Sequence, residues 1–125
     1  MTDFRFERLR VYHQAKELHM KIVLYTKNFL RESFYLKDQI RRSSLSVVLN
    51  IAEGSGKQST KEQNRFFEHS FASISETVAA IDIAIDSKLI VQSVGKELML
   101  QYQGLRNQLG ALCKSLKIRY QTSDI

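Results

Sequence analysis

Six basic residues between positions 37 and 65 are the clearest candidate for a binding function in this sequence. They are Lys37, Arg41, Arg42, Lys57, Lys61 and Arg65. Lysine and arginine neutralise backbone phosphates and release condensed counterions, so these residues form a candidate nucleic-acid site. Adjacent residues on a helix diverge by about 100°, so Arg41 and Arg42 cannot serve the same purpose. The alternative is that one arginine points inward and pairs with Glu53 or Glu76, while the lysines are simply solvated.

A polar stripe runs through the same region. Its members recur at steps of four and three and therefore share one face of a helix: Gln39, Ser43, Ser46, Asn50 and Glu53. We interpret Asn50 and Glu53, together with Glu76, as a structural polar network rather than as catalytic groups. A buried carboxylate must be paired, and Arg41 or Arg42 of the same or a neighbouring subunit would supply the charge-assisted bond.

The remaining reactive side chains do not form a recognisable catalytic or metal-binding pattern. The three histidines, His13, His19 and His69, lack ligand spacing, and none completes a Glu-x-x-His motif. The 54–57 sequence Gly-Ser-Gly-Lys lacks the spacing of a phosphate-binding loop. Cys113 has no basic partner arranged as a catalytic dyad requires. We therefore predict no enzymatic activity, no metal and no cofactor.

The elements that position these residues are predicted by apolar periodicity. Apolar residues step by four and three over 11–29, 67–85 and 98–116, as in helices that pack at about 20°. With the central basic segment this makes an all-α protein of four helices. The predicted bounds are 6–29, 36–54, 60–87 and 95–120. Short connections between them predict an antiparallel, up-down-up-down four-helix bundle.

The predicted connections contain residues suited to ending or starting a helix. Ser33 could cap the second helix, and Ser59 with Glu62 three residues later forms a capping box. Gly54 or Gly56 could end the second helix in the left-handed conformation. The chain has no proline, which also favours helices.

Composition limits the class of protein. A chain of 125 residues is long enough for one domain, 1–125, with its own core. The net charge is +6, and all of the excess lies in residues 1–61, where 12 Lys and Arg face 6 Asp and Glu. No apolar run approaches the roughly 20 residues that span a bilayer, and the N-terminus is charged. We therefore expect a basic, cytoplasmic protein with no membrane contact and no evident small-molecule substrate.

Three apolar residues of the second helix exceed what a four-helix core requires: Leu45, Val48 and Leu49. Surplus apolar surface on a small protein often marks an oligomer interface. We predict that the chain associates with itself through these residues.

The stretch from Gln39 to Phe67 carries a family resemblance. It is similar to the signature of bacterial four-helix bundle proteins associated with intervening sequences in 23S ribosomal RNA genes. The matching residues are Gln39, Ile40, Arg41, Arg42, Ser46, Asn50, Ile51, Ala52, Glu53, Gly54, Lys57, Ser59, Lys61, Phe66 and Phe67. The sequence departs from the family at Phe29, which is followed by Leu30 where the family often has proline.

The resemblance implies a fold and a genomic association but no established reaction. It also implies ring-like homo-oligomers, pentamers above all, as in the family's distant relatives, the accessory proteins of diversity-generating retroelements. We therefore predict a non-enzymatic scaffold that binds nucleic acid, either RNA or DNA and by preference RNA. The alternative is a protein–protein interaction module or assembly scaffold without direct nucleic-acid contact.

Overall fold

The computed structural model describes residues 2–123 of the protein, with side chains described as far as residue 116. Within these residues the chain forms four α-helices and no strand. Their bounds are Arg10–Thr26 (α1), Phe34–Ser55 (α2), Thr60–Asp86 (α3) and Gln92–Ser123 (α4). Short 3-10 turns at Arg5–Arg8 and Arg31–Ser33 precede α1 and α2.

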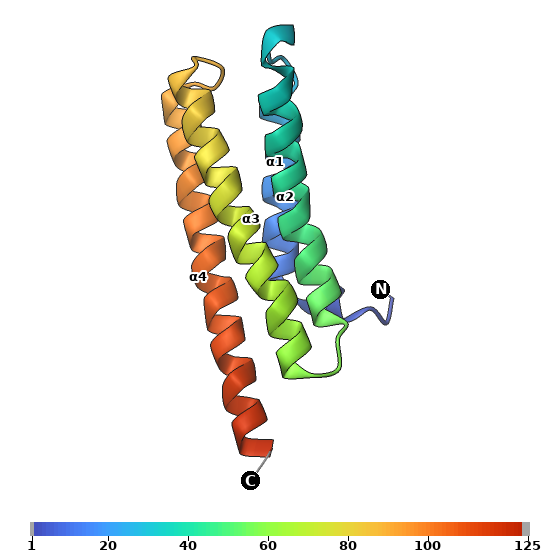
Figure 1. The fold of residues 1–125 in the computed structure, drawn as a ribbon. Helices are drawn as coiled ribbons and strands as arrows, with labels where there is room; N and C mark the ends of the chain where they lie inside the picture. Colours follow the sequence, from blue (N-terminus) through green and yellow to red (C-terminus); the bar gives the residue numbers. More distant parts are fainter. Residues whose placement is uncertain (1, 124–125) are drawn as a thin grey trace.

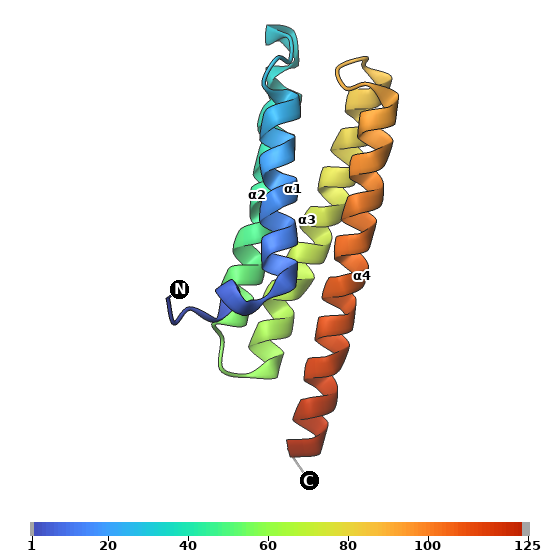
Figure 2. The same cartoon turned by 180° about the vertical axis from the view of Figure 1, so that it is seen from behind.

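The four helices run alternately up and down, and both termini lie at the lower end of the bundle (Figure 1). The opposite view shows α1 beside α2 and α3 beside α4, with the N-terminal segment crossing the lower end of α2 (Figure 2). This is the antiparallel four-helix bundle predicted from the sequence. No helix among the described residues has both the length and the apolar composition needed to cross a membrane.

The predicted apolar periodicity corresponds to the core. Ile22, Ile81 and Leu109, one from each of the three periodic segments, are fully buried. Tyr25, in the last turn of α1, departs from the pattern because it is 42 % exposed. Two of the three surplus residues behave as expected: Leu45 and Leu49 are 42 % and 56 % exposed. Val48 is instead only 4 % exposed, because it lies on the inner face of α2 and belongs to the core.

The starts of α1 and α4 differ from the bounds predicted from the sequence. The predicted first helix starts at residue 6, whereas α1 starts at Arg10, because Leu9 is extended (φ −90°, ψ 120°) and separates the 3-10 turn from the helix. Helix α4 starts at Gln92, three residues earlier than predicted. The start and end of α2 and α3 lie within two residues of the predicted bounds.

The predicted cap at Ser59 is confirmed and the one at Ser33 is wrong, whereas Gly56 ends α2 as predicted but without the left-handed conformation. The Ser59 hydroxyl accepts a hydrogen bond from the backbone N–H of Glu62 at 3.2 Å. The side chain of Ser33 makes no capping hydrogen bond, because a 3-10 turn precedes α2. No glycine among the described residues has a positive φ. Gly56 ends α2 with φ −85°, and the residue that takes the left-handed conformation is Lys88, with φ 63°.

Gly54 is required for a different reason, the close approach of α3. A Cβ atom at this position would lie 2.8 Å from Cε1 of Phe67 and 3.1 Å from the Cβ of Phe66. Real Cβ atoms do not tolerate the shorter distance, so a side chain here would push α2 away from the fully packed ring of Phe67. The glycine sets the spacing of the lower ends of α2 and α3.

The substitution Gly54→Ala is therefore expected to destabilise the fold by about 1–3 kcal/mol through overpacking. The measurement is urea unfolding followed by circular dichroism. Gly56→Ala is the control, because its nearest non-neighbouring atom would be 3.6 Å away; it is expected to be neutral or stabilising by up to about 1 kcal/mol. Equal stabilities of the two variants would contradict the steric role of Gly54.

Candidate nucleic-acid interface

The structure divides the six candidate basic residues into two groups. Lys37, Arg41 and Arg42 lie in the first part of α2, whereas Lys57, Lys61 and Arg65 lie around the α2–α3 turn. Ser55 lies 13 residues after Arg42 on α2, which corresponds to about 20 Å at 1.5 Å per residue. The six cations therefore do not form one continuous patch.

The second group is compact, and we refer to Lys57, Lys61 and Arg65 as the basic turn. The Lys57 ammonium lies 5.0 Å from the centre of the Phe66 ring, and the Arg65 guanidinium carbon lies 5.7 Å from it. Such cation–π contacts hold long side chains in place while their charged ends stay in water. Lys61 and Arg65 are exposed, and Lys57 and Phe66 are half-buried.

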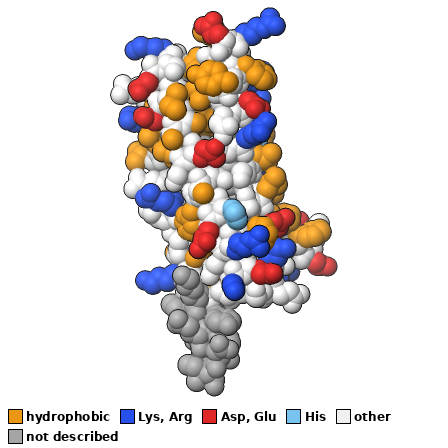
Figure 3. Space-filling model, viewed as in Figure 1, with side chains coloured by type: hydrophobic (Ala, Val, Ile, Leu, Met, Phe, Trp, Pro, Cys, Tyr) orange, Lys and Arg blue, Asp and Glu red, His pale blue; other side chains and the backbone are white. Residues whose placement is uncertain are grey.

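The surroundings of the basic turn contain further charges of both signs. Figure 3 shows Lys and Arg side chains gathered at the lower end of the molecule, with Asp and Glu side chains among them. The exposed residues Glu62 and Glu68 follow on α3. The 3-10 turn Arg5–Arg8, in which both arginines are exposed, contacts α2, and Figure 1 shows this N-terminal segment at the same end of the helix. Sequence reasoning missed these two arginines, although the basic composition of the first ten residues could have indicated them.

Arg41 has a structural position. Its Nε donates to the Thr26 hydroxyl at 2.9 Å, and one terminal nitrogen donates to the carbonyl of Val23 at 3.0 Å. Both acceptors belong to the last turn of α1, where free carbonyl groups and the helix dipole attract a cation. The expectation that an arginine points inward is met, but its partner is the end of α1 and not Glu53 or Glu76.

Lys37 and Arg42 have weaker contacts. The Lys37 ammonium donates to the carbonyl of Lys27 at 3.4 Å, just beyond the end of α1. Arg42 pairs with Asp38 one turn earlier, at 3.3 Å, and its side chain is 75 % exposed. An exposed pair of this kind adds little stability, so Arg42 remains available to a partner.

The expected network of Asn50, Glu53 and Glu76 does not form within the chain. The Asn50 amide donates to the carbonyl and hydroxyl of Ser46, at 2.9 and 3.0 Å. Glu53 is exposed and does not need a buried partner. Glu76 is exposed as well and accepts a hydrogen bond from Gln39. The spacing of the polar stripe was informative, but only Gln39, Ser43 and Ser46 form hydrogen bonds with α3, and the stripe does not form a common carboxylate site.

The stripe is instead one half of a hydroxyl contact between α2 and α3. The Thr77 hydroxyl donates to that of Ser43 at 2.7 Å, and the hydroxyls of Ser46 and Ser73 are 2.8 Å apart. The Ser70 hydroxyl donates to the carbonyl of Val47 at 3.1 Å. These buried polar groups satisfy one another across the helix interface, which is a structural role.

Between α1 and α2, His19 takes part in a similar contact. Its Nδ1 lies 2.7 Å from the hydroxyl of Ser44. Desolvation lowers the pKa of His19 below its ordinary value of 6.5, and the neighbouring Arg41 cation lowers that pKa further. A histidine next to a serine can suggest a catalytic pair, but the Ser44 residue is fully buried and inaccessible to a substrate.

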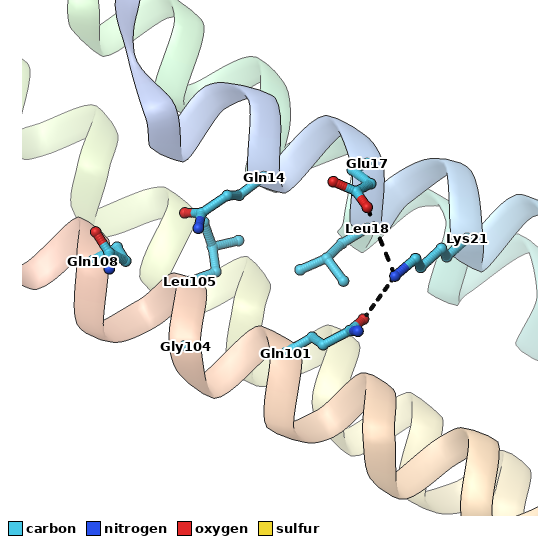
Figure 4. Close-up of a pocket in the computed structure, with 8 residues that line it drawn as sticks. All are labelled: Gln14, Glu17, Leu18, Lys21, Gln101, Gly104, Leu105 and Gln108. Carbon is cyan, nitrogen blue, oxygen red and sulfur yellow. Dashed lines mark hydrogen bonds and ion pairs between the residues drawn. The ribbon is translucent and has the colours of Figure 1, made fainter.

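A cleft of about 290 Å³ lies between α1 and α4. Figure 4 shows Lys21 between Glu17 and Gln101, with contacts of 3.8 and 3.2 Å. The other polar side chains at the cleft are the amides of Gln14 and Gln108. The lining contains no histidine or cysteine that could act as a base or nucleophile, and the described residues contain no cluster of three His, Cys, Asp or Glu that could hold a metal ion.

The fold and these surfaces define the class of protein: an all-α, antiparallel four-helix protein with a basic turn at one end. A family model described as 23S rRNA-intervening sequence protein matches residues 7–111. Since the match covers all of α1, α2 and α3 and most of α4, the chain belongs to this family. A search of curated proteins found no match.

The contrast between Arg41 and Arg42 gives a direct test of the site geometry. Arg41→Ala is expected to destabilise the fold by about 1.5–3 kcal/mol, because it removes two hydrogen bonds from a charged donor. Arg42→Ala is expected to change the stability by at most about 0.5 kcal/mol, as for other exposed residues. Chemical denaturation of both variants measures the difference, and a larger effect at Arg42 would refute this assignment.

His19 predicts a pH dependence of stability. Because its pKa is lower in the folded state, the unfolded chain binds the proton more readily, and stability falls as the pH drops below about 6.5. Urea titrations between pH 7.5 and 5 are expected to show a smaller loss for His19→Gln than for the unmodified protein. His69→Gln changes an exposed ring and should retain the full loss; an identical profile for His19→Gln would contradict the prediction.

Proposed function

We propose that this protein is a non-enzymatic, self-associating scaffold that binds RNA through its basic turn. The family description contains 23S rRNA, which makes structured ribosomal RNA the first ligand to consider. The observation that carries the proposal is the placement of Lys57, Lys61 and Arg65 around the first turns of α3. Lys57 follows the carboxyl end of α2, where a cation is favoured. Lys61 lies in the first turn of α3, where the dipole is positive and gives a cation no stability, whereas a phosphate there would be attracted by both the cations and the dipole of α3.

The geometry of the basic turn supports contact with the phosphate backbone more than with bases. The Phe66 ring is already covered by Lys57 and Arg65, so stacking of a base on it would have to displace these cations. Exposed Arg5 and Arg8 would extend the contact around the same end of the bundle. Glu62 and Glu68 would repel phosphate nearby, which limits the number of phosphates engaged. An RNA partner would place the protein in the cytoplasm.

Self-association is the second part of the proposal. Leu45 and Leu49 expose apolar surface on the outer side of α2, and exposed apolar surface of this kind favours association. A ring of five subunits is the arrangement that the family resemblance implies. Repetition of the basic turn around a ring would multiply weak phosphate contacts on a single RNA molecule.

The same exposed leucines also favour the alternative, a module that docks another protein without touching nucleic acid. The two functions differ in their response to nuclease. A protein partner would remain bound to the immobilised chain after ribonuclease treatment, whereas an RNA-bridged partner would be released.

The RNA proposal is tested by fluorescence anisotropy with a labelled, structured fragment of 23S rRNA at several salt concentrations. The triple variant Lys57→Gln, Lys61→Gln and Arg65→Gln is expected to bind more weakly. The slope of log affinity against log salt should fall by about 2–3, because each lost phosphate contact removes roughly 0.7–0.9.

The matched control removes three exposed charges elsewhere, through Lys16→Gln, Lys27→Gln and Arg31→Gln. It should keep nearly all of the affinity and slope. Absence of binding by the unmodified protein at low salt would refute the proposal, and equal losses in the two triple variants would refute the role of the basic turn.

A further inference from the structure

The outer side of α3 and α4 carries an apolar groove of about 740 Å³. Val78 and Met99 contribute to its apolar surface, together with Leu100, which is 62 % exposed. Two small residues of α3, Ser75 and Ala79, leave room between the helices. Hydrophobic side chains are interspersed with charges on the face of the molecule seen in Figure 3. Within the described part of the chain, no segment fills this groove.

The same molecule exposes a ridge that has the complementary shape. Asp38, Arg42, Leu45 and Leu49 of α2 are spaced by four, three and four residues, so they share the outer face of this helix. The two leucines project from the middle of the helix, and the Asp38–Arg42 ion pair lies next to them. A leucine ridge of this spacing is the type of surface that packs between the side chains of two other helices.

The charges of the ridge and the groove lie at the same height along the bundle. Ser43 of α2 and Thr77 of α3 are hydrogen-bonded and therefore level. Asp38 lies five residues before Ser43, and Asp82 lies five residues after Thr77. Because α2 and α3 are antiparallel, both positions are about 7.5 Å from the hydrogen-bonded pair in the same direction, toward the α3–α4 turn. Lys96 and Asp82 are each four residues from the helix ends at that turn, and both line the groove.

We propose that the α2 ridge of one copy of this chain docks in the α3–α4 groove of a second copy. This inference rests on the self-association proposed above and adds the surfaces through which the copies meet. When two copies stand side by side with parallel axes, every residue keeps its height. Asp38 then faces Lys96 of the second copy. The backbone of Arg42 lies four residues, or about 6 Å, below the level of Asp82, but its guanidinium extends up to Asp38 at 3.3 Å and so comes within reach of Asp82.

The apolar parts match in the same register. Leu45 lies two residues below Ser43, as Ser75 lies two residues below Thr77, so this leucine reaches the small residues of the second copy's groove. Leu49 follows one turn further, at the lower end of the groove, which Gln103 and Arg106 of the second copy line. The occupant is therefore identified by charge and by height together, since an unrelated protein would have no reason to match the spacing within this chain.

The geometry also determines the type of assembly. The ridge and the groove are different surfaces, so the contact is head-to-tail and leaves one free ridge and one free groove on every pair. Repetition of such a contact forms a ring when the rotation between neighbours closes.

Two variants test the contact without touching the core. The ridge variant carries Leu45→Glu and Leu49→Glu, and the groove variant carries Ala79→Glu and Leu100→Glu; all four positions are exposed. Circular dichroism and thermal unfolding establish that both variants fold. In sedimentation velocity, the unmodified protein is expected to be an oligomer and each variant alone a monomer.

An equimolar mixture of the two variants is the decisive sample. One intact ridge and one intact groove remain in it, so the mixture is expected to form a dimer that contains one copy of each and grows no further. If the groove variant stays oligomeric while the ridge variant is monomeric, the ridges pack against each other and the proposal is overturned. Oligomers in both separate variants would likewise exclude this interface while leaving self-association intact.

A monomeric unmodified protein, even at high concentration, would instead overturn the self-association on which the inference rests. RNA binding is measured separately and does not depend on this result.

A charge exchange tests the register. Asp38→Lys is expected to weaken assembly on the order of tenfold, because an attraction to Lys96 becomes a repulsion. Combining it with Lys96→Asp should restore most of the affinity. Asp86→Lys makes the same charge change on an exposed residue outside the groove and should leave assembly unchanged; failure of the double variant to recover would overturn the proposed register.

Discussion

The close contact between α2 and α3 is the constraint on which the rest of the bundle depends. Gly54 permits the approach at one end, and the hydroxyl pairs Ser43–Thr77 and Ser46–Ser73 continue it along the interface. Small side chains let the two backbones approach. Their hydroxyl groups must be hydrogen-bonded once they are buried, because an unpaired buried hydroxyl costs free energy. A shift of one helical turn would separate these partners, so the interface permits one register where leucine packing alone would tolerate several.

That register decides what the other faces of α2 can do. With small and polar residues turned toward α3, the branched residues Ile40, Val47 and Ile51 fill the bundle interior, and the leucines at 45 and 49 remain outside. On the side toward α1, Arg41 binds the last turn of α1, which fixes the start of α2 against the end of its neighbour. Helix α2 thus contacts α3, the core and α1 on three of its faces. Leu45 and Leu49 lie on the remaining face and are therefore exposed.

The parts of this structure that could be predicted from the sequence are those with a repeating signal. Apolar residues at steps of four and three identified α1, α3 and α4, and Ser59 with Glu62 identified the start of α3. Features that depend on one particular contact could not be predicted this way. The spacing of the polar stripe placed Asn50 and Glu53 on one face, but only the approach of α3 determines that serines find partners there while Glu53 is exposed. Likewise, Val48 and Leu49 are equally apolar, and the position of α1 decides which of them is buried.

The roles of the cations follow from the ends of the helices beside which they lie. Arg41 and Lys37 lie beside the carboxyl end of α1, where the dipole attracts a cation, so their positive charge contributes to the stability of the fold. The basic turn joins the carboxyl end of α2, which favours Lys57, to the amino end of α3, where the dipole opposes a cation such as Lys61. Lys57 and Arg65 each make a cation–π contact with Phe66. A single cation would be enough for such a contact, so it does not explain why three cations lie together. Lys61 is exposed and makes neither kind of stabilising contact, so its position beside Lys57 and Arg65 is the feature on which the proposed RNA contact rests.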